Sequence, residues 1–228
     1  MRDIHFYFDV ISPYAWLAFK SLPATLKGIE HRVHYHPVVF GAMLKHHGQL
    51  GPAELPGKRD WTYRQVMWLA KQQGTVLQMP ASHPFNSLAL QRMAVATSPN
   101  GEPAREVVQA IFEHVWCSGL EATDANRVAE LQTHLTQLMQ LMQLRQKSEP
   151  SFQMDIQAPE VKQKLQQQTQ AAIDLGLFGV PSMIVDGQVF WGQDALPMLR
   201  AYVEGDAWFE SSEWLDVGKL PVGVRRAP

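Results

Sequence analysis

Residues 8–15, FDVISPYA, carry the strongest fold signal in this chain. This stretch continues a short aromatic and β-branched run, HFYFDV at 5–10, which is typical of a buried strand. Ser12 and Pro13 then predict the start of a helix. A serine oxygen can accept an otherwise unpaired backbone N–H, and proline loses no hydrogen bond at the first helical position. We therefore expect a strand, a tight turn and a helix from Pro13 to about Lys27.

A second strand is predicted at 33–40, where Pro37 would interrupt the ladder and so indicates an edge, a bulge or a strand end. The stretch 40–57 looks like a loop. Beyond it the pattern is helical, with helices predicted at about 58–73, 86–97, 102–116 and 124–144. In the last of these, leucines and a valine recur every three or four positions, as one buried helix face requires. The middle of the chain is therefore expected to be an all-helical insertion.

The C-terminal half predicts a helix at about 159–175, strands at 182–185 and 188–191, and a helix at 194–203. Asp186-Gly187 between the strands is a strong two-residue hairpin signal. The whole order is β-α-β, helical insertion, α-β-β-α. We expect one domain from 1–45 and 160–205, an insertion at 46–159 and a tail at 206–228, whose two tryptophans argue against disorder.

Composition excludes several classes of function. The 20 Lys and Arg against 22 Asp and Glu give a net charge of -2, so nucleic acid and anionic membranes are not expected partners. No run of 18 apolar residues and no secretion signal is visible. The single cysteine, Cys117, excludes an intramolecular disulfide and suits a reducing compartment, so we expect a cytoplasmic protein. The nine histidines lack metal-ligand spacing; no metal is expected, and we interpret them as surface or cap residues.

The predicted order of elements resembles the α/β thioredoxin-like fold of DsbA-like proteins, whose catalytic group sits at the start of the first helix. A redox member has CxxC there, whereas this chain has Ser12, so thiol–disulfide exchange is not expected. A helix N-terminus favours a bound anion, and the Ser12 hydroxyl could donate to a thiolate placed there. The alternative is that Ser12 is only a helix cap.

Several separated motifs together resemble one family: FYFDVISPYAWLA, KRDWTYRQVMWLAKQQG, HPFNSLALQR, EHVWCSG and FGVPSMIVDGQVFWGQD. They resemble the 2-hydroxychromene-2-carboxylate isomerases, which are related to kappa-class glutathione transferases. The resemblance implies glutathione as cofactor, with Ser12 activating its sulfur and the backbone of Val180, beside Pro181, holding its cysteinyl unit. It also implies that the γ-glutamyl end is held by Trp191, Gly192, Gln193 and Asp194. Taken singly, Gly179-Val180-Pro181 could be only a turn, Trp191 a core residue and Asp194 a helix cap.

The second substrate implied by the resemblance is an aromatic acid, whose carboxylate needs a cation and whose ring needs an apolar slot. Candidate residues are Lys45, Lys58, His83 and Asn86. The family resemblance implies isomerisation of 2-hydroxychromene-2-carboxylate to trans-o-hydroxybenzylidenepyruvate by reversible thiolate addition, in a homodimer. A kappa-like glutathione transferase and a non-catalytic glutathione-binding module are the alternatives. The chain departs from the family pattern at Asp194-Ala195, where an acidic residue and an arginine are familiar, and in its longer tail.

Overall fold

The computed structural model describes residues 1–149 and 151–224. Residue 150 of the predicted insertion and residues 225–228 of the predicted tail therefore lie outside the described part. The elements in chain order are β1 (Arg2–Phe8), α1 (Pro13–Thr25), β2 (His31–Pro37), α2 (Phe40–His46), η1 (Pro52–Glu54), α3 (Pro56–Gln73), α4 (Leu88–Ala96), α5 (Arg105–Trp116), α6 (Ala125–Arg145), α7 (Pro159–Asp174), β3 (Ser182–Val185), β4 (Gln188–Trp191), η2 (Gln193–Ala195), α8 (Leu196–Glu204), η3 (Ala207–Glu210) and α9 (Ser212–Val217).

The four strands form one mixed sheet in the order β2-β1-β3-β4. β1 runs parallel to β2, while β3 is antiparallel to both β1 and β4. Asp186 and Gly187, which join β3 to β4, have φ values of 49° and 79°, the left-handed pair that a two-residue hairpin turn requires. The predicted β-α-β and α-β-β-α halves are therefore both present, and the predicted bounds of β3 and β4 are confirmed.

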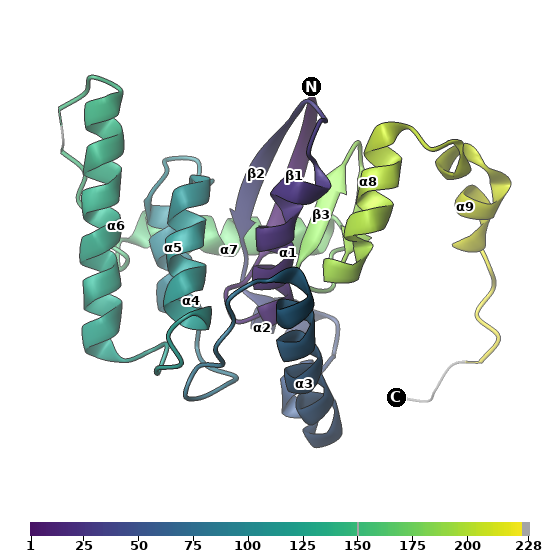
Figure 1. Cartoon of the computed structure of the whole chain (residues 1–228), viewed down its shortest axis with the longest axis horizontal. Helices are drawn as coiled ribbons and strands as arrows, with labels where there is room; N and C mark the ends of the chain where they lie inside the picture. The colour runs from purple at the N-terminus through teal and green to yellow at the C-terminus, as the bar shows by residue number, and fades with distance from the viewer. Residues whose placement is uncertain (150, 225–228) are drawn as a thin grey trace.

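One face of the sheet packs against α1 and α5 (Figure 1). Ile4, Phe6 and Phe8 alternate along β1 and are fully buried on this side. The ring of Phe8 lies 5.4 Å from that of Phe112 on α5. Burying side chains of this size contributes about 1.5–3 kcal/mol each, so this aromatic layer holds α1, and with it Ser12, against the sheet.

The opposite face carries a small cluster in which Tyr7 packs with Met43 of α2 and Ala172 of α7. Beside it His5 and His36 form a ring-nitrogen hydrogen bond of 2.9 Å, and burial lowers the pKa of His36 to about 4. The interpretation of every histidine as a surface or cap residue is therefore wrong for His36, because β2 places its side chain on a covered sheet face.

The helices between β2 and α7 share the main core with the sheet: Ile111, Leu131 and Leu135 belong to the same buried cluster as Phe6. The limits of the predicted insertion stay a prediction. The apolar face expected along α6 is buried only in its first half, because α6 extends past the end of α5 (Figure 1) and leaves Leu141 exposed.

Two further expectations need correction. The predicted strand at 33–40 ends at Pro37, which has no N–H for the ladder. The predicted loop at 40–57 instead begins with α2, and the Phe40 N–H at its start donates to the Asp9 carboxylate rather than to a strand.

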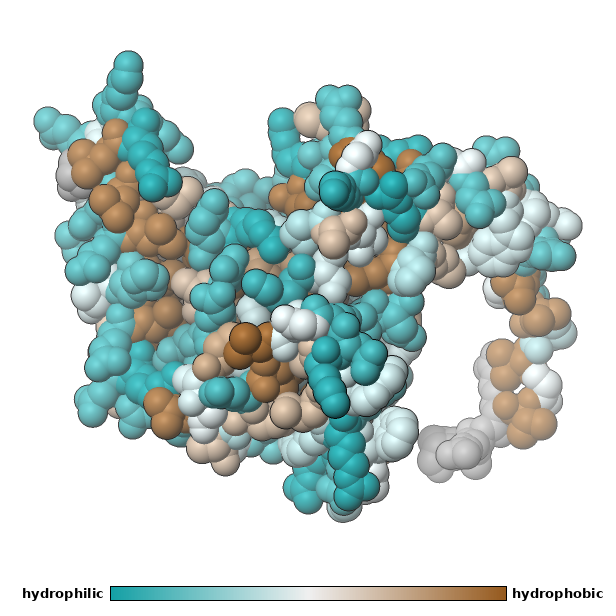
Figure 2. All heavy atoms as spheres, in the orientation of Figure 1, coloured by the Kyte–Doolittle hydropathy of each residue, from teal (hydrophilic) through white to brown (hydrophobic). Residues whose placement is uncertain are grey.

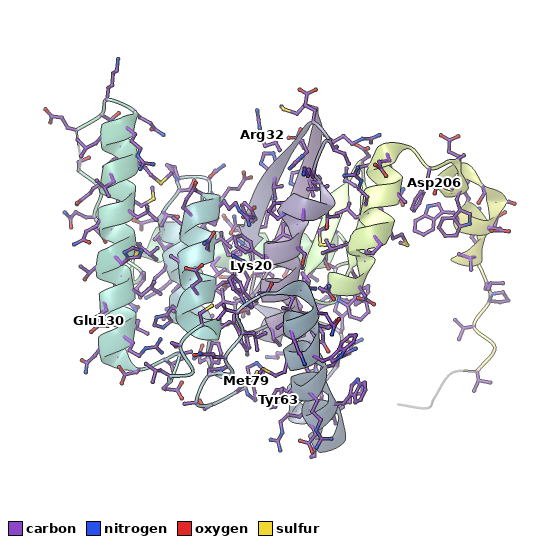
Figure 3. All side chains as sticks on the ribbon, in the orientation of Figure 1. Lys20, Arg32, Tyr63, Met79, Glu130 and Asp206 are labelled. Atoms are coloured by element: carbon purple, nitrogen blue, oxygen red, sulfur yellow. The ribbon has the colours of Figure 1, made fainter. Side chains whose placement is uncertain are left out.

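The tail packs on α8 through Phe209, whose ring lies 5.1 Å from Tyr202. Asp206, labelled in Figure 3, caps the turn that carries Phe209 by accepting from the Trp208 N–H. Beyond α9, Leu220 is exposed, and apolar residues lie along the outermost part of the molecule in Figure 2. None of the helices in the described residues has the length and apolar character needed to cross a bilayer.

Candidate functional site

Ser12 lies at the N-terminus of α1 and meets Val180 from the other half of the fold. Its Oγ accepts from the Ala15 N–H at 3.2 Å and donates to the Val180 carbonyl at 3.3 Å. The cap explains why the helix starts at Pro13. The second bond joins residues 168 apart in the chain, so the structure brings together two of the predicted glutathione residues.

The Val180-Pro181 peptide is cis. The Pro181 carbonyl accepts from the Gly192 N–H at 2.9 Å, and the Ser182 hydroxyl donates to the Gly179 carbonyl at 2.7 Å. The first bond ties the segment before β3 to the segment after β4, and the second closes the turn around the cis peptide. The backbone of Val180 is therefore held at a defined position next to Ser12.

Trp191 lies over Gly179, beside Val180. A Cβ added to Gly179 would fall 2.6 Å from the Trp191 Nε1, so only glycine allows the indole to lie this close. Trp191 is 53% exposed and packs edge-on against Phe178, 40% exposed, at 4.8 Å. Sequence reasoning missed Phe178. Two exposed rings beside a buried serine form an apolar rim to the site.

Gly192 and Asp194 make the turn after β4. Gly192 has φ 96°, and a Cβ there would lie 2.4 Å from the Asp194 Oδ1. Gln193 and Asp194 line a groove of about 770 Å³ between α1 and α8, and Lys27 and Arg200 line the same groove. Ser12 and Val180 are outside that lining, but the Asp194 charge is near enough to add to burial in raising the pKa of Tyr14, two residues after Ser12.

The loop before Ser12 is held by three side chains from the helical middle of the chain. Gln91 Oε1 accepts from the Val10 N–H at 3.4 Å, Trp116 Nε1 donates to the Val10 carbonyl at 2.9 Å, and His83 Nε2 bonds the Ile11 carbonyl at 2.8 Å. Buried backbone groups cost free energy when they are unpaired. These bonds therefore fix the loop that presents Ser12.

Asp9, in the same loop, is a buried carboxylate that sequence reasoning missed. It accepts from the Ile11 N–H at 3.1 Å and the Phe40 N–H at 2.9 Å, and so joins the Ser12 loop to the start of α2. Burial raises its pKa to about 6, against the lowering effect of these hydrogen bonds. The sequence signal that could have revealed Asp9 is its position as an acidic residue inside an apolar run next to Ser12.

The four candidates for the substrate carboxylate occupy different places. His83 has both ring nitrogens engaged, Nε2 with Ile11 and Nδ1 with the hydroxyl of Tyr63, a residue of α3 labelled in Figure 3. Burial lowers the pKa of His83, which favours the neutral ring. Asn86 is exposed at the start of α4, where its Oδ1 accepts from the Leu88 N–H at 3.0 Å.

The two lysines point to different regions. Lys58 is exposed on α3 and shares a helix face with Thr62 and Gln65, at spacings of four and seven residues. Gln65 Oε1 accepts from the Tyr14 hydroxyl at 2.6 Å, which places this face beside the start of α1. Lys45 instead lines a separate cavity between α2, α4 and α7. The structure therefore does not bring the four candidates together.

Comparison with known proteins gives consistent results. Residues 3–204 match the sequence model of the DSBA-like thioredoxin domain. The chain is 26% identical over 202 residues to 2-hydroxychromene-2-carboxylate isomerase of Pseudomonas putida, covering 87% of this chain and 92% of that one. It is 25% identical over 224 residues to glutathione S-transferase kappa 1 of Rattus norvegicus, covering 91% and 92%.

Among solved structures, a 2-hydroxychromene-2-carboxylate isomerase superposes with a TM-score of 0.70 at 22% identity, covering 92% of this chain and 98% of that one. The cytosolic disulfide reductase DsbM from Pseudomonas aeruginosa with GSH superposes with a TM-score of 0.52 at 14% identity, covering 89% and 97%. The expected fold and the resemblance to the isomerases and kappa-class transferases are thus confirmed. Since the matched region spans the sheet and all but the tail helices, the chain belongs to the DsbA-like thioredoxin domain family.

Proposed function

We propose that this protein is a glutathione-dependent isomerase that interconverts 2-hydroxychromene-2-carboxylate and trans-o-hydroxybenzylidenepyruvate in aromatic catabolism. The observation that carries the proposal is the contact of the Ser12 hydroxyl with the Val180 carbonyl at the N-terminus of α1. The named isomerase and kappa-class relatives support a glutathione-related enzyme. Bound glutathione would supply a thiolate whose reversible addition to the substrate turns a double bond into a single bond that can rotate.

The residues present fit glutathione. Among the described residues, the N–H groups of Tyr14 and Val180 have no acceptor. The Tyr14 N–H lies in the first turn of α1, where the helix dipole favours a negative charge. The Val180 N–H and carbonyl suit the two backbone groups of an extended cysteinyl unit. The Asp194 carboxylate suits a ligand ammonium, and Lys27 and Arg200 of the adjacent groove suit a ligand carboxylate.

In this proposal the Ser12 hydroxyl donates its hydrogen bond to one of two acceptors. Its hydroxyl donates to the Val180 carbonyl in the structure, and would turn to donate to the thiolate of bound glutathione. The released carbonyl then accepts from the ligand backbone. A free cysteine thiol has a pKa of about 8.5, and a helix N-terminus with a hydroxyl donor lowers such values. Ser12 therefore stabilises the thiolate and is not itself the nucleophile.

For the aromatic acid, we assign the carboxylate to Lys58, with Asn86 as a neutral donor. The Tyr14–Gln65 hydrogen bond supports Lys58 because it sets that face of α3 beside the start of α1. We further propose a cytoplasmic homodimer. The single cysteine and the exposed Leu215 and Leu220 of the tail support these two points, and light scattering of the purified protein tests the second.

A kappa-like glutathione transferase is the second candidate. The rat kappa-class relative matches the chain about as well as the isomerase does. The two functions share Ser12, Val180 and Asp194 and differ in the electrophile. Conjugation of an aryl halide with consumption of glutathione, and no turnover of hydroxychromene-carboxylate, would favour the transferase. Glutathione binding without either reaction would favour a binding module.

The test follows the absorbance of 2-hydroxychromene-2-carboxylate with and without glutathione, for the wild type and Ser12→Ala. Turnover should require glutathione without consuming it. Because Ser12 donates to a developing charge, Ser12→Ala should lower kcat/KM by about 10²–10³-fold. The thiolate absorbance of bound glutathione should also appear at a higher pH in the variant.

Ser211→Ala is the matched control. Ser211 caps α9 by accepting from the Trp214 N–H, as Ser12 caps α1, but it lies in the tail. Each substitution should cost about 1 kcal/mol of stability as a lost cap. If the two variants isomerise the substrate equally well, or if turnover proceeds without glutathione, the proposed function is wrong.

A further inference from the structure

A cavity of about 590 Å³ lies between α2, α4 and α7, and none of its lining residues belongs to the Ser12–Val180 site. Three helices each contribute one cation to it, Lys45 from α2, Arg92 from α4 and Lys162 from α7, and α2 adds the ring of His46. Its lining in the described part of the chain includes no Asp or Glu. The whole chain has a net charge of -2, so general basicity does not explain this concentration of positive charge. We call it the cationic cavity.

The cations of this cavity have no charged partner. No ion pair in residues 1–149 and 151–224 includes Lys45, Arg92 or Lys162. The Arg92 Nε is moreover buried without a hydrogen-bond partner. A buried guanidinium nitrogen without an acceptor costs free energy, and three like charges around one cavity repel each other. A bound anion would relieve the repulsion between the three charges.

Helix capping explains only part of the arrangement. Lys45 and His46 lie in the last turn of α2, where the helix dipole favours positive charge. Arg92 lies in the middle of α4 and Lys162 in the first turn of α7, where the dipole gives a cation no advantage. The helix dipole therefore does not explain why Arg92 and Lys162 line the same cavity as the α2 residues. A ligand shared by all of them explains their positions better.

The other walls define the ligand. Leu88, Leu165 and Ile173 give an apolar surface, and Gln166 adds an amide that can donate or accept. The Thr169 hydroxyl is already used, since it donates to the Leu165 carbonyl and accepts from the Val39 N–H. The volume is in the range of small-molecule sites. We propose that the cationic cavity binds a small organic anion with two acidic groups and an apolar body, of the aromatic dicarboxylate class.

Titration calorimetry of the full chain with phthalate, at constant ionic strength, tests this inference independently of the proposed function. Phthalate should bind, benzoate with one carboxylate should bind more weakly, and the neutral phthalamide should not bind. Inorganic phosphate supplies charge without an apolar body and should also bind more weakly. Phosphate binding as tightly as phthalate, or equal binding of phthalamide, would overturn the assignment.

The variants locate the site. Arg92→Gln should weaken phthalate binding by about tenfold or more, because a charge-assisted hydrogen bond is lost. Lys162→Gln, an exposed change that should not disturb folding, should weaken it by several-fold. Lys71→Gln is the control, since Lys71 is an exposed lysine of α3 outside the lining.

Ser12→Ala distinguishes this site from the glutathione site. Phthalate should bind to Ser12→Ala as tightly as to the wild type, and glutathione should bind to Lys162→Gln as tightly as to the wild type. Loss of phthalate binding in Ser12→Ala, or unchanged phthalate binding in both Arg92→Gln and Lys162→Gln, would overturn the inference whether or not the protein proves to be an isomerase.

Discussion

At Ser12 a single hydroxyl serves as a helix cap and as a bridge to the other half of the fold. It accepts from Ala15 N–H and donates to the Val180 carbonyl. Two neighbours set its surroundings. Asp9 holds the backbone that precedes it, and Gly179 allows Trp191 to approach Val180. Substitutions of Asp9 and Gly179 therefore test the surroundings of Ser12, because these residues act on the site without touching its reacting atoms.

Asp9→Asn should change how stability depends on pH. The folded pKa of Asp9, about 6, lies above its usual 3.8, because burial favours the neutral form. Its contribution to stability is therefore full below about pH 4 and is lost as the pH rises through 6. This corresponds to about 3 kcal/mol. In denaturant unfolding, the free energy of unfolding of the wild type should fall by this amount relative to that of Asp9→Asn between pH 4 and pH 7. A difference between the two proteins that does not change with pH would contradict the prediction.

Gly179→Ala should weaken glutathione binding with little change in stability. The new Cβ would fall on the Trp191 indole, which is exposed and can move away. We expect about a tenfold rise in Kd, the loss of one good contact, and a free energy of unfolding within about 1 kcal/mol of wild type. Gly41→Ala in α2, where a Cβ meets nothing, is the control. Equal calorimetric affinities for the two variants would remove Trp191 from the site.

At the scale of elements, α3 sets one face toward the start of α1. Lys58, Thr62 and Gln65 follow each other at helical spacing, and Gln65 accepts from the Tyr14 hydroxyl. The motif KRDWTYRQVMWLAKQQG predicted a helix here, and α3 confirms it. Which face meets the site depends on packing, and so it became visible only in the structure.

Lys58→Gln should raise KM for the aromatic carboxylate by about tenfold, because a hydrogen bond to a charged group contributes about 1.5–3 kcal/mol. kcat should change less, since this lysine binds the carboxylate before and after isomerisation. Lys71→Gln, thirteen residues further and on the opposite side of α3, is the matched control. Steady-state kinetics that give both variants wild-type KM would assign the carboxylate to another residue.

At the scale of the whole molecule, the helical middle of the chain positions the site loop. Gln91, Trp116 and His83 come from three segments and bond the backbone at Val10 and Ile11. Gln91 Nε2 also donates to the carbonyls of Phe8 and Val38, at the ends of β1 and β2. The helices therefore do more than cover the sheet, because they satisfy the polar groups of the loop before Ser12.

Gln91→Leu should destabilise the protein and lower glutathione affinity together. The substitution keeps the volume but leaves the Val10 N–H and the Val38 carbonyl without their partner, while the Phe8 carbonyl keeps only the Val38 N–H, which should cost on the order of 3 kcal/mol. Gln167→Leu, exposed on α7, should stay within about 0.5 kcal/mol of wild type. Denaturant unfolding and calorimetry check both effects. A stable Gln91→Leu with normal glutathione affinity would contradict the role of the helices in holding the loop.

The features that could be predicted from the sequence are those that depend on neighbouring residues. Ser12-Pro13 predicted the start of α1, and Asp186-Gly187 predicted the hairpin, because caps and turns use atoms only a few residues apart. Packing in three dimensions was needed to place Gln91 against Val10, to bury Asp9, and to put Lys45 at a cavity away from Ser12. These contacts join segments distant in the chain, and their partners are chosen by how the helices pack on the sheet.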